Sequence, residues 1–152
     1  MREILFRGKR MDNGELVFGD LIREPWGYCI QVVTGSGNGY SRKKYAITEE
    51  TVGQYTGLKD KNGKRIFEGD IVRTHYANAR KADFVEQVVF HNGRFSSLYI
   101  LREFGNGKMW ANLPDDVPHL PLDKTPYMEW CEIIGNIYDN PEILGGGQNN
   151  EC

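Results

Sequence analysis

The carboxylate, histidine and cysteine side chains of this 152-residue sequence are the first candidates for chemistry, and their spacing argues against metal binding. The histidines, His75, His91 and His119, are far apart, and no HExxH motif or cysteine–histidine cluster occurs. A structural zinc site needs such ligands at short spacings, so we expect no metal and no cofactor. Residues 60–63, Asp-Lys-Asn-Gly, begin like a calcium loop, but the glycine comes too early and the twelfth position is not acidic. We interpret this segment as a hairpin turn.

No nucleophile stands in a known catalytic motif. Cys29 and Cys131 lie in apolar, strand-like segments, where an inert buried thiol is the expected state, and Cys152 lies in the C-terminal tail. No GxSxG motif occurs. Glu68 and Asp70 would share one face of a strand, where common burial could raise a carboxyl pKa and make a general acid. Turn formation explains both residues more simply, so we expect no catalytic residue and no enzyme.

Four clusters of basic residues, several with aromatic neighbours, make nucleic-acid binding an alternative. The clusters are Arg7/Lys9/Arg10, Arg42/Lys43/Lys44, Lys59/Lys61/Lys64/Arg65 and Arg80/Lys81. The neighbouring aromatic residues are Phe6, Tyr40, Tyr45, Tyr55, Phe67 and Tyr76. Small β-barrels bind single strands by stacking bases on aromatic rings above a basic groove. The competing interpretation places the rings in the core and the solvated cations at hairpin tips.

Charge is unevenly divided along the chain, which could steer partners or promote association, although simple solvation of both parts explains the modest excess more readily. Residues 1–100 hold 16 basic and 12 acidic residues, whereas residues 101–152 hold 3 basic and 9 acidic ones. An acidic segment of one copy could meet a basic surface of another copy or of a different protein. The acidic residues between Trp110 and Trp130 are Asp115, Asp116, Asp123 and Glu129. This segment could equally cover its own chain, and both alternatives stay open.

Length and hydropathy place the chain among ordinary globular proteins. A chain of 152 residues suits one domain with a short extension, and 39% hydrophobic and 26% charged residues are close to average. The apolar runs reach about four residues, far below the roughly 18 needed to span a bilayer. The N-terminal residues lack the apolar core of a signal peptide, and the three widely spaced cysteines fit a reducing compartment. We therefore expect a cytoplasmic protein with no membrane partner.

Three Asn-Gly pairs between β-like segments, at positions 13–14, 62–63 and 92–93, are the strongest structural signal. Asn-Gly suits a type I′ turn because both central residues need positive φ, and this turn matches the twist of the flanking strands. The glycine-rich segment 35–39 lacks the Gly-Lys-Ser/Thr and the helix of a phosphate-binding loop, so we interpret it as another hairpin tip. No segment shows a long helical periodicity. The sequence therefore predicts a mainly β protein built from antiparallel hairpins.

The order of the expected strands suggests a small barrel after an N-terminal hairpin region. The core strands are expected at 66–73, 84–90, 94–101 and 130–137. The Gly-Asp step before Ile71 and Val72 is typical of the point at which small SH3-like barrels enter a strand. Residues 113–129 hold four of the six prolines and are predicted to form an irregular arm or a short helix. We divide the chain into an N-terminal β-hairpin region (1–49), an SH3-like β-barrel (50–144) and a flexible tail (145–152).

Three separated stretches of the sequence match one known family in their order. They are Ile4–Lys9 with Asn13–Gly19, then Thr51–Lys64 running on into Ile66–Val72, and finally Ile133–Glu142. The central stretch, TVGQYTGLKDKNGK, is the most specific. In these stretches the chain resembles the YopX family of phage and prophage proteins, nearly end to end. The intervening residues 23–49 and 76–130 contribute little to the resemblance.

The resemblance implies a mostly β structure with an SH3-like barrel, and an intracellular setting during infection or in a lysogen. It implies no activity, cofactor or catalytic residue. The glycines of the central motif serve turns, whereas the polar residues around Tyr55 are not needed for them. The candidate binding surface consists of Gln54, Tyr55, Thr56, Lys59, Lys61, Lys64 and Arg65.

Taken together, these features favour a phage or prophage accessory protein that acts by binding. The partner we expect first is a host or phage protein, or a second copy of the chain in a homo-oligomer. The alternative is single-stranded or duplex nucleic acid bound by a basic β-barrel surface. A small hydrolytic enzyme ranks third.

Overall fold

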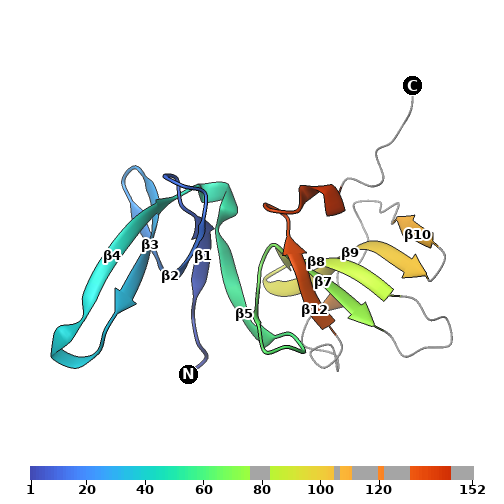
Figure 1. Ribbon diagram of the computed structural model, residues 1–152, viewed down its shortest axis with the longest axis horizontal. Helices are drawn as coiled ribbons and strands as arrows, with labels where there is room; N and C mark the ends of the chain where they lie inside the picture. The colour runs from blue at the N-terminus through green and yellow to red at the C-terminus, as the bar shows by residue number, and fades with distance from the viewer. Residues whose placement is uncertain (76–82, 105–106, 111–119, 122–130, 145–152) are drawn as a thin grey trace. The chain divides into compact units, whose positions relative to one another are not determined.

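The computed structural model describes residues 1–75, 83–104, 107–110, 120–121 and 131–144 (Figure 1). The chain forms two compact units, Met1–Gly57 and Leu58–Cys152. The described strands form two antiparallel sheets, which confirms the mainly β class. The division after Gly57 lies further along the chain than the boundary at 49/50 that the sequence suggested. The predicted tail at 145–152, and the predicted arm at 113–129 apart from one two-residue strand, lie outside the described residues.

The first unit is a curved antiparallel sheet with the strand order β4-β3-β2-β1-β5. Its strands are β1 (Phe6–Lys9), β2 (Leu16–Glu24), β3 (Gly27–Thr34), β4 (Ser41–Ile47) and the first part of β5 (Gly53–Lys59). Two 3₁₀ helices, η1 (Gly37–Gly39) and η2 (Glu49–Thr51), lie between them. The predicted type I′ turn, with positive φ at both central residues, is found at Asn92-Gly93 (φ +50 and +75). The β1–β2 turn differs: Gly14 has φ +73 but Asn13 does not have positive φ, and the side chain of Asn13 accepts a hydrogen bond from the backbone N–H of Glu15.

Strand β2 changes its neighbour halfway along its length. Residues 16–19 pair with β1, and residues 20–24 pair with β3. The change occurs at Gly19, where an added Cβ would lie 2.1 Å from the carbonyl oxygen of Gln31. Since real side chains do not approach backbone that closely, this crossing requires glycine. The end of the edge strand β4 also meets the chain just after β1, because the Met11 N–H donates to the Ala46 carbonyl at 2.9 Å.

The second unit is built on a sheet with the strand path β10-β9-β8-β7-β12. Its strands are β6 (Arg65–Phe67), β7 (Asp70–His75), β8 (Asp83–His91), β9 (Arg94–Phe104), β10 (Gly107–Trp110), β11 (Leu120–Pro121) and β12 (Cys131–Asn136), and the 3₁₀ helix η4 (Pro141–Ile143) follows. Strand β11 pairs with β9, and β6 pairs with β5. The described strands form open sheets and do not close into the barrel that was expected over residues 50–144.

The sheets stay open because a sharp turn interrupts the expected strand 66–73. Gly69 has φ +90, and the Phe67 N–H donates to Asp70 Oδ2 at 2.8 Å across the turn. This turn separates β6 from β7, so β6 pairs with β5 while β7 pairs with β8 and β12. Asp70 is buried and fixes the turn, which supports the simpler of the two interpretations of the Glu68/Asp70 pair.

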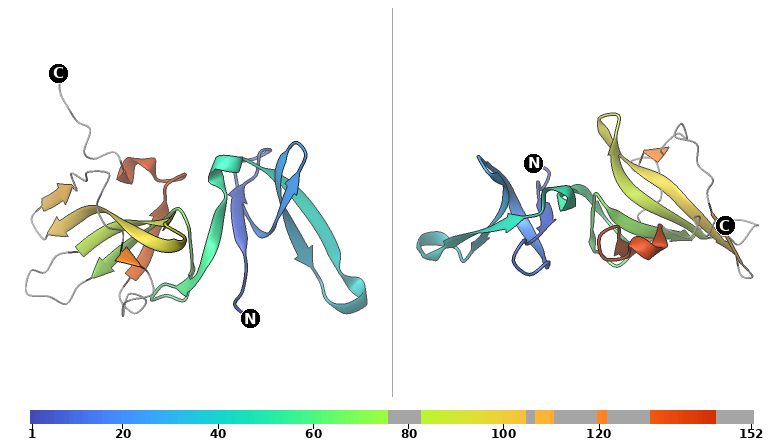
Figure 2. Two further views of the ribbon diagram at one scale, coloured as in Figure 1. Left: turned by 180° about the vertical axis from the view of Figure 1, so that it is seen from behind. Right: turned by 90° about the horizontal axis from the view of Figure 1, so that it is seen from above.

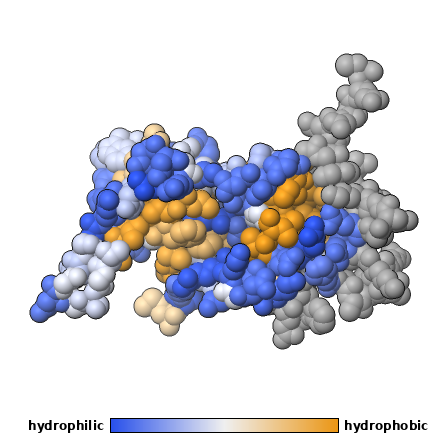
Figure 3. All heavy atoms as spheres, in the orientation of Figure 1, coloured by the Kyte–Doolittle hydropathy of each residue, from blue (hydrophilic) through white to orange (hydrophobic). Residues whose placement is uncertain are grey.

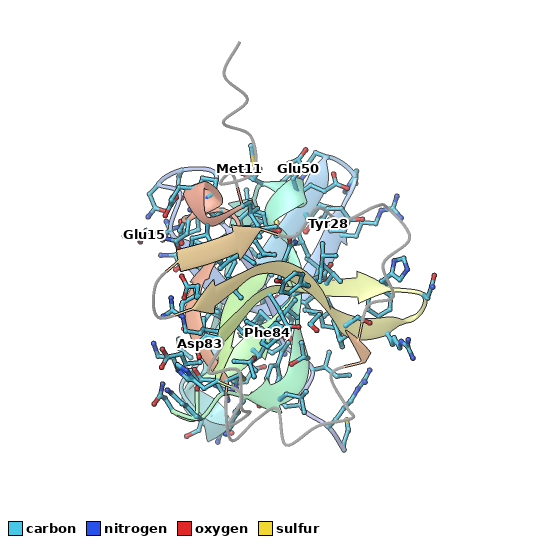
Figure 4. All side chains as sticks on the ribbon, turned by 90° about the vertical axis from the view of Figure 1, so that its right-hand side faces the viewer. Met11, Glu15, Tyr28, Glu50, Asp83 and Phe84 are labelled. Atoms are coloured by element: carbon cyan, nitrogen blue, oxygen red, sulfur yellow. The ribbon has the colours of Figure 1, made fainter. Side chains whose placement is uncertain are left out.

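Apolar side chains cover both faces of the second sheet. Ile71 and Val72 are adjacent in β7 and fully buried, and adjacent strand residues point to opposite faces. One cluster consists of Ile66, Val72, Val88 and Cys131. The other consists of Ile71, Val85 and Leu101, packed against Ile137 and Ile143 near the C-terminal 3₁₀ helix. At the start of β8 (Figure 4), Asp83 Oδ1 lies 2.7 Å from His75 Nδ1, and the Phe84 ring centroid lies 5.8 Å from that of Tyr99. The predicted core strands are confirmed here, apart from the interruption at Gly69.

The buried carboxylate of Asp60 fastens the β5–β6 hairpin to β12. Its Oδ1 accepts the backbone N–H groups of Asn62 and Lys64, both at 2.9 Å. Its Oδ2 accepts the N–H of Ile133 at 3.0 Å, and the Lys61 N–H donates to the Cys131 carbonyl. The residue that suggested a calcium loop is therefore a structural anchor of the turn. No helix in the described part of the chain has the length and apolar character needed to cross a membrane.

Replacing Asp60 by Ala should destabilise the second unit. The substitution removes the acceptor of three backbone N–H groups, and leaving a buried donor unpaired costs about 1–3 kcal/mol. We expect a lower urea midpoint and faster hydrogen exchange at the Ile133 amide. Asn62→Ala is the matched control, because the exposed Asn62 contributes only its backbone N–H to this network. Equal exchange rates at Ile133 in both variants would contradict the anchoring role.

Cys131 gives the stability a dependence on alkaline pH. Burial, with a smaller contribution from the carboxylates of Asp60 and Glu86, raises the pKa of the Cys131 thiol to about 11 from an ordinary value of 9.0. Between these two values the unfolded chain loses the thiol proton while the folded chain keeps it. The free energy of unfolding should therefore fall as the pH rises through this range.

The measurement is a pair of urea titrations at pH 8 and pH 10.5 on the native chain and on Cys131→Ala. The alanine variant should lose less stability than the native chain between the two pH values, whatever its stability at pH 8. Identical losses would show that the thiol does not titrate as its burial requires.

Candidate functional site

The β3–β4 hairpin carries a concentrated positive charge. Residues 25–48 contain Arg42, Lys43 and Lys44 and no acidic residue at all. All three cations lie on β4, and all three are exposed. Strand β4 also ends the strand order of the first unit. A run of three cations therefore lies on an edge strand, and the hairpin that contains it has no acidic residue.

The distal part of this hairpin is a ribbon of only two strands. Strand β2 supports β3 as far as Gln31. Beyond that residue β3 pairs with β4 alone, through Val32–Lys43, Val33–Arg42 and Thr34–Ser41. Figures 1 and 2 show the hairpin running out past the inner strands of the unit. We call residues 32–34 and 41–43, with the connecting tip, the distal ribbon.

Cations occupy both faces of the distal ribbon. Arg42 and Lys43 are adjacent in β4, so their side chains leave the ribbon on opposite faces. On one face the Lys43 ammonium lies 5.2 Å from the centroid of the Tyr45 ring. On the other face the Arg42 guanidinium lies 5.3 Å from the centroid of the Tyr40 ring. Each tyrosine therefore holds a cation by the attraction of the ring for positive charge.

Two nearby cations are neutralised by partners within the unit. The Lys44 ammonium donates to Glu24 at 2.7 Å, and this hydrogen bond raises the pKa of Lys44. Arg10, whose guanidinium lies 4.3 Å from the centroid of the Tyr45 ring, donates to Asp12 through Nε at 2.9 Å. That hydrogen bond raises the pKa of Arg10 and lowers the pKa of Asp12. Neither Arg42 nor Lys43 forms an ion pair with any residue that the structure describes, so their charge faces the solvent.

The outer edge of β4 is open over most of its length. Ala46 and Ile47, at its C-terminal end, are joined to residues 10 and 11. Among the described residues, no strand pairs with the outer side of residues 41–45. On an edge strand every second residue turns its backbone N–H and C=O outward. In Figure 3 the visible face of the ribbon tip is white to blue, whereas orange residues gather over the inner strands.

The surface predicted around Tyr55 and Lys59 is divided between the two units. Gln54, Tyr55 and Thr56 belong to the first unit, and Tyr55 is only 5% exposed, so its ring is not available for stacking. The four cations of the predicted surface, Lys59, Lys61, Lys64 and Arg65, belong to the second unit and are exposed. Lys61 forms an ion pair with Glu132 at 2.7 Å and lowers the pKa of that carboxyl.

The other sequence candidates do not gather into a site. Arg7 is buried, with 4% exposure, and Arg80 and Lys81 lie outside the described residues. Cys29 and Cys131 are buried, as expected for inert thiols. No group of three or more metal-binding side chains occurs in the described part of the chain. The predicted acidic partners at 115, 116, 123 and 129 also lie outside the described residues.

Sequence reasoning found the Arg42/Lys43/Lys44 cluster but missed what distinguishes it from the others. The sequence feature that could have revealed this difference is the run without acidic residues from residue 25 to residue 48. The pairing of Tyr45 with both Arg10 and Lys43 had no signal in the sequence, because residues 10 and 45 become neighbours only when the end of β4 meets the chain just after β1.

Comparison with known proteins gives the chain a family. A crystal structure of protein EF1440 from Enterococcus faecalis is similar to it, with a TM-score of 0.54 and 23% sequence identity, over 95% of this chain and 99% of that one. At this identity the likeness shows a shared fold. None of the curated proteins compared with the chain matches it. The family model described as "YopX protein" matches residues 5–145. The chain therefore belongs to the YopX family.

Proposed function

We propose that this YopX-family protein binds nucleic acid without catalysing a reaction, and that the distal ribbon makes the contact. The observation that carries the proposal is the pair Arg42 and Lys43, exposed on opposite faces of a ribbon whose hairpin contains no acidic residue. Cations that neutralise phosphates release counterions, and this release supplies most of the affinity of non-specific nucleic-acid binding. We propose further that it is an accessory protein of a phage or prophage and acts in the bacterial cytoplasm, and the resemblance noted in the sequence supports this.

The charge of the ribbon favours an anionic polymer over a second copy of the same strand. Two open β4 edges could in principle pair with each other. Such a pairing would place the runs Arg42–Lys44 of the two copies side by side, and like charges across strands are destabilising. Exposed lysines on an edge strand are a common way to prevent that pairing. A phosphate backbone meets the same cations with the opposite sign.

Three groups in the described residues that were considered for chemistry are committed to the fold. Asp60 and Asp70 accept backbone hydrogen bonds within turns, and Cys131 is buried, with a thiol pKa raised to about 11. A catalytic thiol needs a lowered pKa and access to substrate. These placements support the proposal that the protein acts by binding alone.

Charge reversal at the ribbon should weaken nucleic-acid binding. In Arg42→Glu/Lys43→Glu, two phosphate contacts are lost, so the slope of log affinity against log salt should become shallower by about 1.8 for duplex DNA. The affinity at about 0.1 M salt should fall roughly tenfold or more. Fluorescence anisotropy of labelled DNA across a salt series measures both quantities.

The matched control is Lys59→Glu/Lys64→Glu, which makes the same charge change in the second unit. Both lysines are exposed, and the circular dichroism spectra of both variants should match that of the native chain. Binding that falls equally in the two variants would point to net charge alone. Binding that falls only in the control would move the site to the surface predicted around Lys59.

The second candidate function is binding to protein, including self-assembly, and the charge division of the sequence favours it. Residues 101–152 hold 9 acidic residues against 3 basic ones. If these acids meet a basic surface of another copy, Asp115→Lys/Asp116→Lys should lower the oligomeric mass measured by sedimentation velocity at low salt. An unchanged mass would leave the acidic residues as solvated side chains.

A further inference from the structure

Building on the proposed function, we propose that the partner is duplex DNA and that the distal ribbon enters its major groove edge-on. In this arrangement the open edge of β4 faces the base pairs. Arg42 and Lys43 then face the two sugar–phosphate backbones that form the walls of the groove. The proposal names both the class of ligand and the orientation of the ribbon in it.

The dimensions of a two-stranded ribbon fit this orientation. Sheets pack about 10 Å apart, which is the thickness of one sheet with its side chains, and the strands within it are about 4.8 Å apart. The major groove of B-DNA is about 12 Å wide and about 8.5 Å deep, and it admits a two-stranded ribbon. When the edge of β4 faces the floor of the groove, the thickness of the ribbon spans the width of the groove. Strand β3 then lies near the rim of the groove.

The ribbon can enter because, within the described residues of the first unit, no strand flanks its distal part. The pairing of β2 with β3 stops at Gln31, so no third strand widens the ribbon over residues 32–34 and 41–43. Val33, Thr34, Ser41, Arg42 and Lys43 are all exposed. An inserted ribbon needs both faces accessible at once. Of residues 32–34 and 41–43 all but the half-buried Val32 are exposed, so both faces are largely accessible within the described part of the first unit.

The opposite placement of the two cations supplies the electrostatic part of the fit. Because Arg42 and Lys43 leave opposite faces, an edge-on ribbon directs one cation toward each wall of the groove. A ribbon lying flat on the floor of the groove would direct one of them to the bases and the other to solvent. Two opposed phosphate contacts are therefore specific to the edge-on orientation.

The outer edge of β4 supplies contacts at the floor of the groove. Over residues 41–45 this edge has no partner strand among the described residues, so alternate backbone N–H and C=O groups point outward. Base pairs present hydrogen-bond donors and acceptors in the major groove. Backbone groups can pair with them without selecting one sequence strongly, so we expect binding of modest sequence preference.

The two tyrosine rings beside the cations of the ribbon each carry a cation on one face, which makes single strands the less favoured ligand even though the Tyr40 ring is 54% exposed. Single-strand binding proteins stack bases on open aromatic rings. Here the Tyr45 ring is contacted by both Arg10 and Lys43, and the Tyr40 ring is contacted by Arg42. Duplex RNA fits no better, since its major groove is too deep and narrow for side chains to read.

The first experiment compares ligands and grooves with the full chain. Anisotropy titrations use one mixed sequence as duplex DNA, single-stranded DNA and duplex RNA. Dimethyl sulfate probing of the complex then reports protection of guanine N7, in the major groove, and of adenine N3, in the minor groove. We expect duplex DNA to bind most tightly, with protection at guanine N7 and none at adenine N3. Protection confined to adenine N3, or a preference for single strands or duplex RNA, would overturn the inference while leaving the proposed function intact.

The second experiment tests the orientation with single neutralising substitutions. Arg42→Gln and Lys43→Gln should each make the salt slope shallower by about 0.9, and their effects should add in the double variant. If only one of them changes the slope, the ribbon lies flat and the edge-on arrangement is wrong. Lys59→Gln is the matched control and should leave the slope unchanged. Failure of the native chain to bind any of the three nucleic acids would instead reject the proposed function itself.

Discussion

The change of partner along β2 is the constraint on which the first unit depends. Residues 16–19 pair with β1 and residues 20–24 pair with β3, and only a glycine at position 19 lets the Gln31 carbonyl approach closely enough for the crossing. Because β2 leaves β3 at this point, the end of the β3–β4 hairpin has no third strand among the described residues. The same crossing that curves the sheet therefore creates the exposed two-stranded ribbon.

The second unit uses its polar groups in the opposite way. Asp60 and Asp70 are buried and each accepts backbone hydrogen bonds, so their carboxylates hold turns in place instead of meeting solvent. Apolar clusters cover both faces of the sheet of β7, β8, β9 and β12. In the described residues, the carboxylates of this unit serve its turns, although it also exposes the cations of residues 59–65; the distal ribbon of the first unit differs in exposing cations on both of its faces.

Four basic clusters looked equivalent in the sequence, and the structure separates those that it describes by their partners. Arg7 is buried, Arg10 is paired with Asp12, and Lys61 is paired with Glu132. Lys44 is held by Glu24, and its neighbours Arg42 and Lys43 keep their charge toward solvent beside two tyrosine rings. A cation contributes to binding a polyanion only when no internal carboxylate has already neutralised it, which is why local sequence counts overstate such surfaces.

The sequence by itself determined the features that depend on neighbouring residues: the antiparallel β class, the two-residue turn at Asn92-Gly93, the buried state of Cys29 and Cys131, and the motifs of the YopX family. Turn chemistry and alternation act over a few residues, so they can be recognised locally. Only the tertiary structure decided that Gly69 divides a predicted strand, that the strands stay open instead of forming a barrel, and that Arg42 and Lys43 face opposite sides of an unsupported ribbon. Each of these depends on which distant strand satisfies a given backbone N–H or covers a given side chain, and residues far apart in the chain make that choice.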